Sequence, residues 1–333
     1  MTDTRRDQSE HLLPGQLPAP KAELPPLDES QPPWQGRVET VGGLRVHVRR
    51  SDPSATPQNA PTAVYVHGLG GSSTNWTDLG AQLAPWASGI ALDLPGFGFS
   101  EPDRDFDFSL AAQVAALERY VAGLDVGPVH LLGNSMGGAI SALFAARRPD
   151  LVRTLTLISP AVPDLRPDPR RLSDPRMALA FLPLVGPRAR RQLAALTPRQ
   201  RAQQVIELCF ADPSAFPQRR LDELAEEHGA RMALKWATPA LARSTVQIFR
   251  TWLTPGGGSL WSVLPGITAP TLVIWGTEDK VVSVRKAERA AKALPNGRLL
   301  VLPRTGHVAQ MERPAEVARA VLGMWHAVED GRW

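Results

Sequence analysis

A serine between glycines is the residue of this chain best placed to do chemistry. Ser135 stands between Gly133 and Gly137, after the apolar run Val129–Leu132 and before the alanine-rich stretch Ala139–Arg147. A strand that turns sharply into a helix strains its central residue, so the positions two before and two after must lack bulk. Such a turn presents the serine hydroxyl at a sheet edge, beside helix N–H groups that can receive negative charge. The sequence therefore predicts a serine nucleophile.

Two further residues supply the groups that a serine nucleophile needs. A serine hydroxyl is a poor nucleophile at neutral pH, and it requires a base within hydrogen-bond reach that is itself oriented by a third group. Asp279 follows the apolar run Thr271–Trp275, and His307 follows the run Arg298–Leu302. Because the carboxyl ends of parallel strands share one edge of a sheet, we expect both side chains to lie beside Ser135.

Neighbouring residues leave alternatives open at these positions. Glu278 precedes Asp279 and offers a second carboxylate for the same role. His67 lies in a glycine-rich stretch, which is more typical of a residue that shapes a turn than of a base. Glu312 is expected to be a structural anion at the start of the last helix. Cys209 is the only cysteine, and its apolar neighbours indicate a buried thiol.

Strands alternate with helices around these residues. Strands are predicted at Arg37–Val41, Leu44–Arg49, Thr62–Val66, Gly89–Leu92, Val129–Leu132, Leu151–Ile158, Thr271–Trp275 and Arg298–Leu302. Helices are predicted at Trp76–Leu83, Ser109–Leu124, Ala139–Arg147, Val284–Ala293 and Pro314–Val328. This alternation implies an α/β protein whose parallel sheet carries helices on both faces.

The same pattern divides the chain into three parts. Residues 1–33 hold seven prolines among polar neighbours, so we expect a proline-rich leader that is disordered or extended. Residues 34–162 and 267–333 carry the predicted strands and are expected to form one core. Residues 163–266 show no clear buried strand and many prolines, which predicts short helices inserted as a cap.

Five motifs make the chain similar to the α/β-hydrolase family. They occur in the family's order at His67–Gly70, Asp93–Ser100, Gly133–Gly138, Gly276–Asp279 and Gly306–Pro314. The resemblance implies an α/β-hydrolase fold, with a mostly parallel central sheet, helices on both faces and an inserted helical cap. It also implies that Ser135 attacks an acyl carbon, that His307 transfers the proton and that Asp279 orients the imidazole. The backbone N–H groups of Leu69 and Met136 would then form the oxyanion hole.

The resemblance leaves three functions open. The favoured one is a serine hydrolase that cleaves a carboxylic ester of a small to medium apolar substrate through an acyl-enzyme. A carbon–carbon bond hydrolase of the meta-cleavage type often has the same G-N-S-M-G-G elbow, but it usually has proline where Gly71 stands and tryptophan where Val308 stands. A non-catalytic small-ligand binder is the third. Haloalkane dehalogenases and epoxide hydrolases are excluded, because they use aspartate at the position of Ser135.

The expected cap supplies the side chains that would surround a substrate. Six of its aromatic residues are candidates to line an apolar pocket, although each is individually more typical of packing: Phe181, Phe210, Trp236, Phe249, Trp252 and Trp261. The net charge is +4, and residues 164–266 carry 15 Arg and Lys against nine Asp and Glu. Without interleaved aromatic residues, this excess is more typical of a solvated helical face than of a nucleic-acid surface.

Composition also sets expectations for location and partners. No apolar run reaches the length of a membrane span, and the N-terminus lacks the apolar segment of a signal peptide. We therefore expect a soluble, cytoplasmic protein that acts on a small molecule. No metal, cofactor or nucleic-acid partner is expected, and the oligomeric state is left open.

Overall fold

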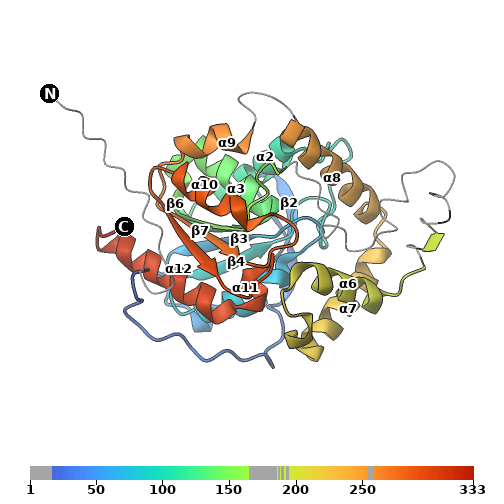
Figure 1. Ribbon diagram of the computed structural model, residues 1–333, viewed down its shortest axis with the longest axis horizontal. Coiled ribbons are helices and arrows are strands. Elements are labelled where there is room, and N and C mark those ends of the chain that lie inside the picture. Colours follow the sequence, from blue (N-terminus) through green and yellow to red (C-terminus); the bar gives the residue numbers. More distant parts are fainter. Residues whose placement is uncertain (1–16, 165–185, 187, 189–190, 193–194, 254–258) are drawn as a thin grey trace.

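An eight-stranded sheet forms the centre of the molecule in the computed structural model (Figure 1), which describes residues 17–164, 186, 188, 191–192, 195–253 and 259–333. Its strands are β1 (Gly36–Val41), β2 (Leu44–Arg50), β3 (Thr62–Val66), β4 (Ser88–Leu92), β5 (Val129–Asn134), β6 (Val152–Ile158), β7 (Thr271–Gly276) and β8 (Gly297–Leu302). They lie in the order β1-β2-β4-β3-β5-β6-β7-β8. β2 pairs antiparallel with β1 and β4, and the other neighbouring strands pair in parallel.

Helices cover both faces of this sheet. The α-helices of the described residues are α1 (Thr77–Leu83), α2 (Leu110–Gly123), α3 (Met136–Arg147), α6 (Pro198–Cys209), α7 (Gln218–Met232), α8 (Ala237–Leu253), α9 (Leu260–Val263), α10 (Ala287–Lys292), α11 (Ala309–Glu312) and α12 (Pro314–Glu329). In Figure 1, α2, α3 and α10 lie on one side of the sheet and α12 on the other. The strands and helices predicted from the sequence are present, with ends shifted by a few residues.

Side chains of the central strands pack alternately into two cores. Val64 and Val66 of β3 join one apolar cluster with Ile140 of α3, whereas Tyr65 joins the opposite cluster with Trp325 of α12. Every residue of β3, β5 and β7 is buried. A strand covered on both faces has a nearly continuous run of apolar residues in its sequence. These runs are why the three strands could be predicted.

A helical insertion separates β6 from β7. Among the described residues it comprises α6, α7, α8 and α9, and Figure 1 shows the first three together at one side of the sheet. α6 begins with a capping box, in which Thr197 and Gln200 exchange hydrogen bonds, and Pro198 occupies its first turn. Residues 165–185, which include the pocket candidate Phe181, lie outside the described residues. No helix in the described ranges is both long and apolar enough to cross a bilayer.

The described part of the N-terminal leader, residues 17–33, is extended and packs against the core. It contains no helix or strand. Lys21 donates its N–H to His326 Nδ1 at 2.9 Å, and the carbonyl of Pro25 accepts from Gln82 at 3.2 Å. Leu17 and Leu24 pack against the apolar cluster beneath the sheet. Contact with this core offsets the conformational entropy that the segment loses when it becomes ordered. The composition of the leader does not indicate this contact.

Candidate active site

Ser135 occupies the turn between β5 and α3. Its backbone has φ 54° and ψ −118°, a conformation that L residues rarely adopt, and its N–H donates to the carbonyl of Ile158 at 3.0 Å. A Cβ at Gly137 would collide with the carbonyl oxygens of Val66 and His67. A Cβ at Gly133 would likewise collide with the carbonyl of Gly137. Both glycines are therefore required by the close packing of this turn.

A buried pair of side chains lies on the loops after β7 and β8. Nδ1 of His307 lies 2.9 Å from Oδ2 of Asp279, and the two side chains are 5% and 0% exposed. The second oxygen of Asp279 accepts the N–H groups of Val281 and Val282 at 2.8 and 2.9 Å. Glu278, the alternative carboxylate, is exposed to solvent. The geometry thus pairs the imidazole with Asp279.

One amide joins the histidine loop to the serine turn. Nδ2 of Asn134 donates to the carbonyl of His307 and to that of Ile158, each at 3.1 Å. Asn134 immediately precedes Ser135, so this contact brings the backbone of His307 against the turn that presents the hydroxyl. The structure therefore brings the three predicted triad residues to one edge of the sheet.

The end of α6 contacts the loops that carry Asp279 and His307. The carbonyl of Cys209, the last residue of α6, accepts the N–H of His307 at 2.6 Å. Lys280 Nζ donates to the carbonyls of Glu207 and Phe210 at 3.0 and 3.1 Å, which satisfies free carbonyls at this helix end. Burial raises the pKa of the Cys209 thiol to about 12, so it stays protonated at neutral pH. The insertion thereby fixes the backbone of His307.

Glu312 adds a second connection between the insertion and the histidine loop. One of its oxygens accepts the N–H of Gly306 at 2.6 Å, and the other accepts those of Ala211 and Asp212 at 3.0 and 3.2 Å. The sequence indicates an anion that stabilises a helix start, but the carboxylate instead bridges two distant backbone segments. Its spacing from the histidine, five residues, is the only signal of this role in the sequence.

The glycine turn, residues Gly68–Gly71, lies beside Ser135. A Cβ at Gly68 would come within 3.0 Å of the Cβ of Ser135. The carbonyl of Gly68 accepts the N–H of Gly71 at 3.1 Å and lies 2.7 Å from Nδ1 of His67. Because Gly68 C=O and Leu69 N–H belong to one trans peptide, fixing the carbonyl directs the N–H to the opposite side.

His67 shapes this turn, as its context indicates. Its Nε2 accepts the N–H of Leu94 at 3.0 Å, so the proton of the neutral ring lies on Nδ1, where it is donated to Gly68. Burial is the main cause that lowers the pKa of His67, which keeps the ring neutral. With both ring nitrogens engaged by the backbone, His67 is not placed to act as a base.

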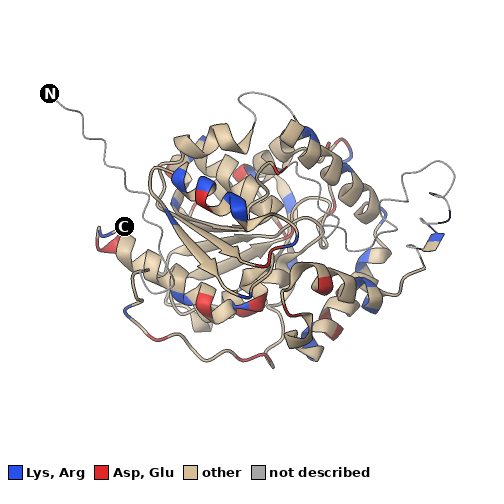
Figure 2. Cartoon of the chain, in the orientation of Figure 1, with Lys and Arg blue, Asp and Glu red and all other residues tan. Residues whose placement is uncertain are grey.

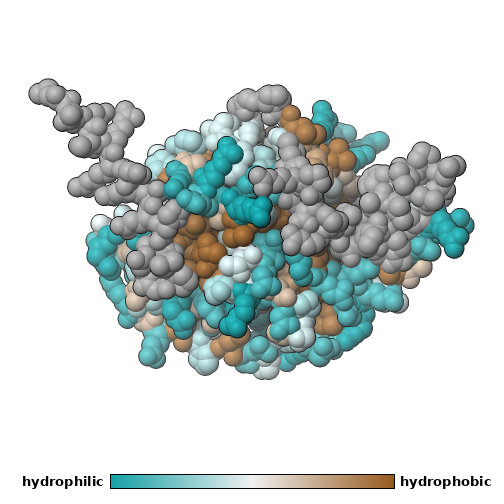
Figure 3. All heavy atoms as spheres, in the orientation of Figure 1, coloured by the Kyte–Doolittle hydropathy of each residue, from teal (hydrophilic) through white to brown (hydrophobic). Residues whose placement is uncertain are grey.

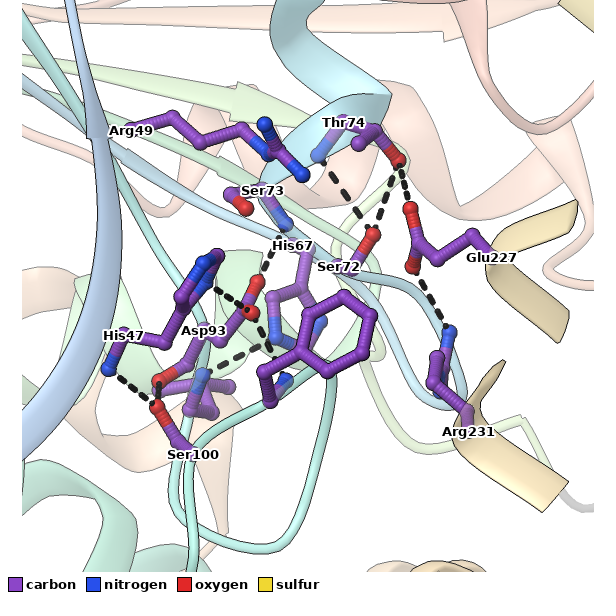
Figure 4. A network of polar contacts seen from close by, with 12 residues as sticks. His47, Arg49, His67, Ser72, Ser73, Thr74, Asp93, Ser100, Glu227 and Arg231 are labelled. Atoms are coloured by element: carbon purple, nitrogen blue, oxygen red, sulfur yellow. Dashed lines mark hydrogen bonds and ion pairs between the residues drawn. The ribbon is translucent and has the colours of Figure 1, made fainter. Parts of the chain in front are cut away.

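Asp93 ties the glycine turn to the loop that follows β4 (Figure 4). One carboxylate oxygen accepts the N–H of Ser73 at 2.6 Å, and the other lies 2.7 Å from Nδ1 of His47 and accepts the N–H of Phe99 at 2.9 Å. Burial alone would raise the pKa of Asp93, but the hydrogen bond with His47 and the N–H groups that the carboxylate accepts hold that pKa at about 2. The carboxylate is therefore ionised and anchors both loops.

A cavity of about 290 Å³ reaches the glycine turn. Its described lining includes Gly70 and Phe97 from the core and the apolar Val205, Met232 and Leu241 from the insertion. These three insertion residues are 39%, 51% and 41% exposed, which places them where the cavity meets solvent. The insertion thus presents an apolar surface beside the turn.

Of the aromatic residues expected to line a pocket, the five that the structure describes are not part of the lining of this cavity. Phe210 packs edge-on against Phe216 in a buried cluster, and the indole N–H of Trp252 donates to the carbonyl of Ala161 at 3.1 Å. Trp261 stacks beneath the guanidinium of Arg289. Phe210 thus packs within the insertion, and the two tryptophans attach the insertion to the core.

Comparison with known proteins identifies the family of this chain. Residues 61–314 match the alpha/beta hydrolase fold family, and because the match covers more than half of the sequence, the chain belongs to that family. The predicted fold class is confirmed: a mostly parallel sheet with helices on both faces and a helical insertion. Within the described residues, no group of three or more His, Cys, Asp and Glu side chains gathers as a metal site would require.

Two curated relatives and two solved structures illustrate the similarity. A monoacylglycerol lipase of Xenopus laevis is 29% identical over 266 residues, 79% of this chain and 74% of that protein. The dihydrolipoyllysine-residue acetyltransferase component of the acetoin cleaving system of Cupriavidus necator is 28% identical over 278 residues, 82% of this chain. This chain spans 64% of that relative's length.

Among solved structures, a bacterial membrane phospholipase A has a TM-score of 0.71 at 27% identity, covering 89% of this chain and 87% of that chain. A meta-cleavage product hydrolase has a TM-score of 0.68 at 18% identity, covering 87% and 98%, which is a likeness of fold alone.

Proposed function

We propose that this protein is a serine hydrolase that cleaves carboxylic esters of small to medium apolar substrates. The observation that carries the proposal is the buried His307–Asp279 pair, whose histidine backbone is bonded to the residue before Ser135. A base oriented by a carboxylate beside a strained serine turn is the arrangement that activates a hydroxyl for acyl transfer.

In the proposed reaction, Oγ of Ser135 attacks the ester carbonyl carbon and its proton passes to Nε2 of His307. Asp279 accepts the Nδ1–H of the imidazole, which leaves Nε2 free to take that proton. The N–H groups of Leu69 and Met136 receive the charge that develops on the carbonyl oxygen. His307 then protonates the leaving alcohol, and water repeats the sequence to release the acid and restore Ser135.

Three features support an ester with an apolar acyl chain. The cavity at the glycine turn has an apolar part, formed by side chains such as Leu196, Val205 and Leu241, beside polar ones such as Arg201 and His228, and its volume suits a medium-length chain. A relative similar over most of both chains is named a monoacylglycerol lipase, and a similar structure is named a phospholipase A. Gly71 and Val308 stand where meta-cleavage enzymes usually have proline and tryptophan. In this proposal the insertion within residues 163–266 acts as the cap that encloses the substrate.

Asp279→Asn is expected to lower kcat for nitrophenyl ester hydrolysis by about 10⁴-fold. Val281 and Val282 donate N–H groups to one side-chain atom of residue 279, so that atom must remain the amide oxygen. The amide NH₂ then faces Nδ1 of His307 and forces the ring proton onto Nε2, where the base is needed. Steady-state kinetics check this, with the exposed neighbour Glu278→Gln as the control. Loss of activity in Glu278→Gln together with an active Asp279→Asn would reassign the acid.

A substrate panel tests the reaction class. We expect kcat/KM for nitrophenyl esters to rise from acetate to octanoate by about fourfold per methylene until the cavity is filled, because each buried methylene contributes about 0.8 kcal/mol. A meta-cleavage dienoate in the same panel is expected to be turned over far more slowly. Cleavage of the dienoate without ester hydrolysis would favour the carbon–carbon hydrolase, and binding without turnover of either would favour a non-catalytic binder.

A further inference from the structure

Two side chains of α7 contact the glycine turn and the segment that follows it from the side of the insertion. Nη2 of Arg231 donates to the carbonyl of Gly70 at 2.9 Å, and Nη1 lies 3.2 Å from Oε1 of Glu227, one helical turn earlier. The other carboxylate oxygen of Glu227 accepts the hydroxyl of Thr74 at 2.7 Å. Figure 4 shows the continuous path from Arg231 through Glu227 to Thr74.

The glycine turn depends on such outside contacts because its own backbone is permissive. Gly68, Gly70 and Gly71 lack side chains, and Gly70 has a positive φ of 74°. The core anchors the turn at the carbonyl of Gly68 and, beyond it, at the N–H of Ser73. Between these two points, Arg231 holds the carbonyl of Gly70. The insertion therefore supplies a contact in the middle of the turn.

The ion pair on α7 is almost withdrawn from solvent, with side-chain exposures of 11% for Arg231 and 7% for Glu227. A buried ion pair adds little net stability, because both charges lose their hydration. The remaining hydrogen bonds of this pair go to the glycine turn and to Thr74. We therefore expect the pair to affect the geometry of the glycine turn more than the stability of the fold. The same helix also carries an exposed i,i+4 pair, Arg219 with Glu223, whose side chains are 50% and 25% exposed.

We propose that Arg231, held by Glu227, is a positioning residue for the oxyanion hole; this inference rests on the proposed function. Fixing the carbonyl of Gly70 orients the Gly70–Gly71 peptide, whose N–H is bonded to the carbonyl of Gly68. That carbonyl and the N–H of Leu69 belong to one peptide, so the contact keeps the N–H directed at the substrate oxygen. The strength of a hydrogen bond falls steeply as its angle departs from linear, so a small rotation weakens this donor. The insertion then completes the oxyanion hole as well as covering the substrate.

The test compares Arg231→Gln with wild type on nitrophenyl acetate and nitrophenyl octanoate. Arg231 also lines the cavity, so a residue that merely contacts the acyl chain would affect the octanoate and spare the acetate. A positioning residue instead lowers kcat for both esters, by about 10- to 100-fold, with KM changed by less than about threefold. Arg231→Lys keeps a cation beside Glu227 and is expected to recover part of this loss. The control Arg219→Gln is expected to stay within about twofold of wild type.

A double variant keeps the test valid if Arg231→Gln folds poorly, since that change leaves Glu227 buried without its partner. Glu227→Gln/Arg231→Gln removes both charges and is expected to show the same loss of kcat on both esters. Wild-type kcat in these variants, or a loss confined to the octanoate, would overturn the proposal. Ser135→Ala separates the two claims. If Ser135→Ala is inactive while Arg231→Gln is fully active, the positioning role alone fails, whereas an active Ser135→Ala contradicts the proposed function.

Discussion

Ser135→Ala is expected to lower kcat for nitrophenyl ester hydrolysis by about 10⁵- to 10⁶-fold while the fold is retained. The change removes the attacking oxygen, and the base and the acid then have no nucleophile to activate. Alanine fits the site because the side chain of Ser135 forms no capping hydrogen bond with α3, and the hydrogen bond from its backbone N–H to the carbonyl of Ile158 remains. Stopped-flow or steady-state kinetics on the acetate ester measure the effect.

A second serine offers a matched control for this variant. Ser141 lies on the same helix, α3, and is fully buried, yet its hydroxyl has no hydrogen-bond partner among the described residues. Ser141→Ala is therefore expected to leave kcat within about twofold of wild type. Retention of wild-type kcat in Ser135→Ala would contradict the assignment of the nucleophile.

His307→Ala is expected to cost a similar factor, about 10⁵- to 10⁶-fold in kcat, because no other group takes the proton from Ser135. This variant leaves the carboxylate of Asp279, which is 0% exposed, without one of its partners. His307→Gln retains an amide donor for that carboxylate but offers no basic nitrogen. We expect it to lose as much kcat as His307→Ala and to keep more of the thermal stability, measured as Tm.

The control for the histidine variants is His326 on α12, which accepts the N–H of Lys21 and lies apart from the loops of the site. His326→Ala is expected to keep wild-type kcat. A His307→Gln protein that hydrolyses esters at the wild-type rate would show that another group acts as the base.

The sheet and the three residues at its edge were predictable because their signals are local. β3 and β7 are short apolar runs bounded by polar or glycine-rich segments, so their type follows from composition and length. Asp279 and His307 each follow such a run, and parallel pairing brings the ends of those runs together. The strands whose sequence pattern is clearest are thus also the ones that position the candidate site residues.

The contacts made by the insertion were not predictable in the same way. Arg231 and Glu227 have the i,i+4 spacing of a helical ion pair, but nothing near them in the sequence indicates Gly70, 161 residues away. Likewise, the carbonyl of Cys209 that binds His307 is a backbone group with no sequence signal. Tertiary packing creates these contacts, and they hold the backbone of Gly70 and of His307 in place.

The packing of the leader was not predictable either. Its prolines and charges indicate a segment without a core of its own, which is correct for residues 17–33 as a description of local structure. Its position depends on a close contact with α12 that composition does not indicate: a Cβ at Gly323 of α12 would collide with the backbone of Pro18. A glycine in the middle of that helix is the one signal that another segment lies against it.

The most direct measurement of the central claim is labelling with a fluorophosphonate, followed by peptide mapping of the modified residue. We predict one label per chain, on the hydroxyl of Ser135, with labelling abolished in Ser135→Ala and strongly slowed in His307→Gln. A label on another residue, or equal labelling of Ser135→Ala and wild type, would contradict the proposal that Ser135 is the activated nucleophile.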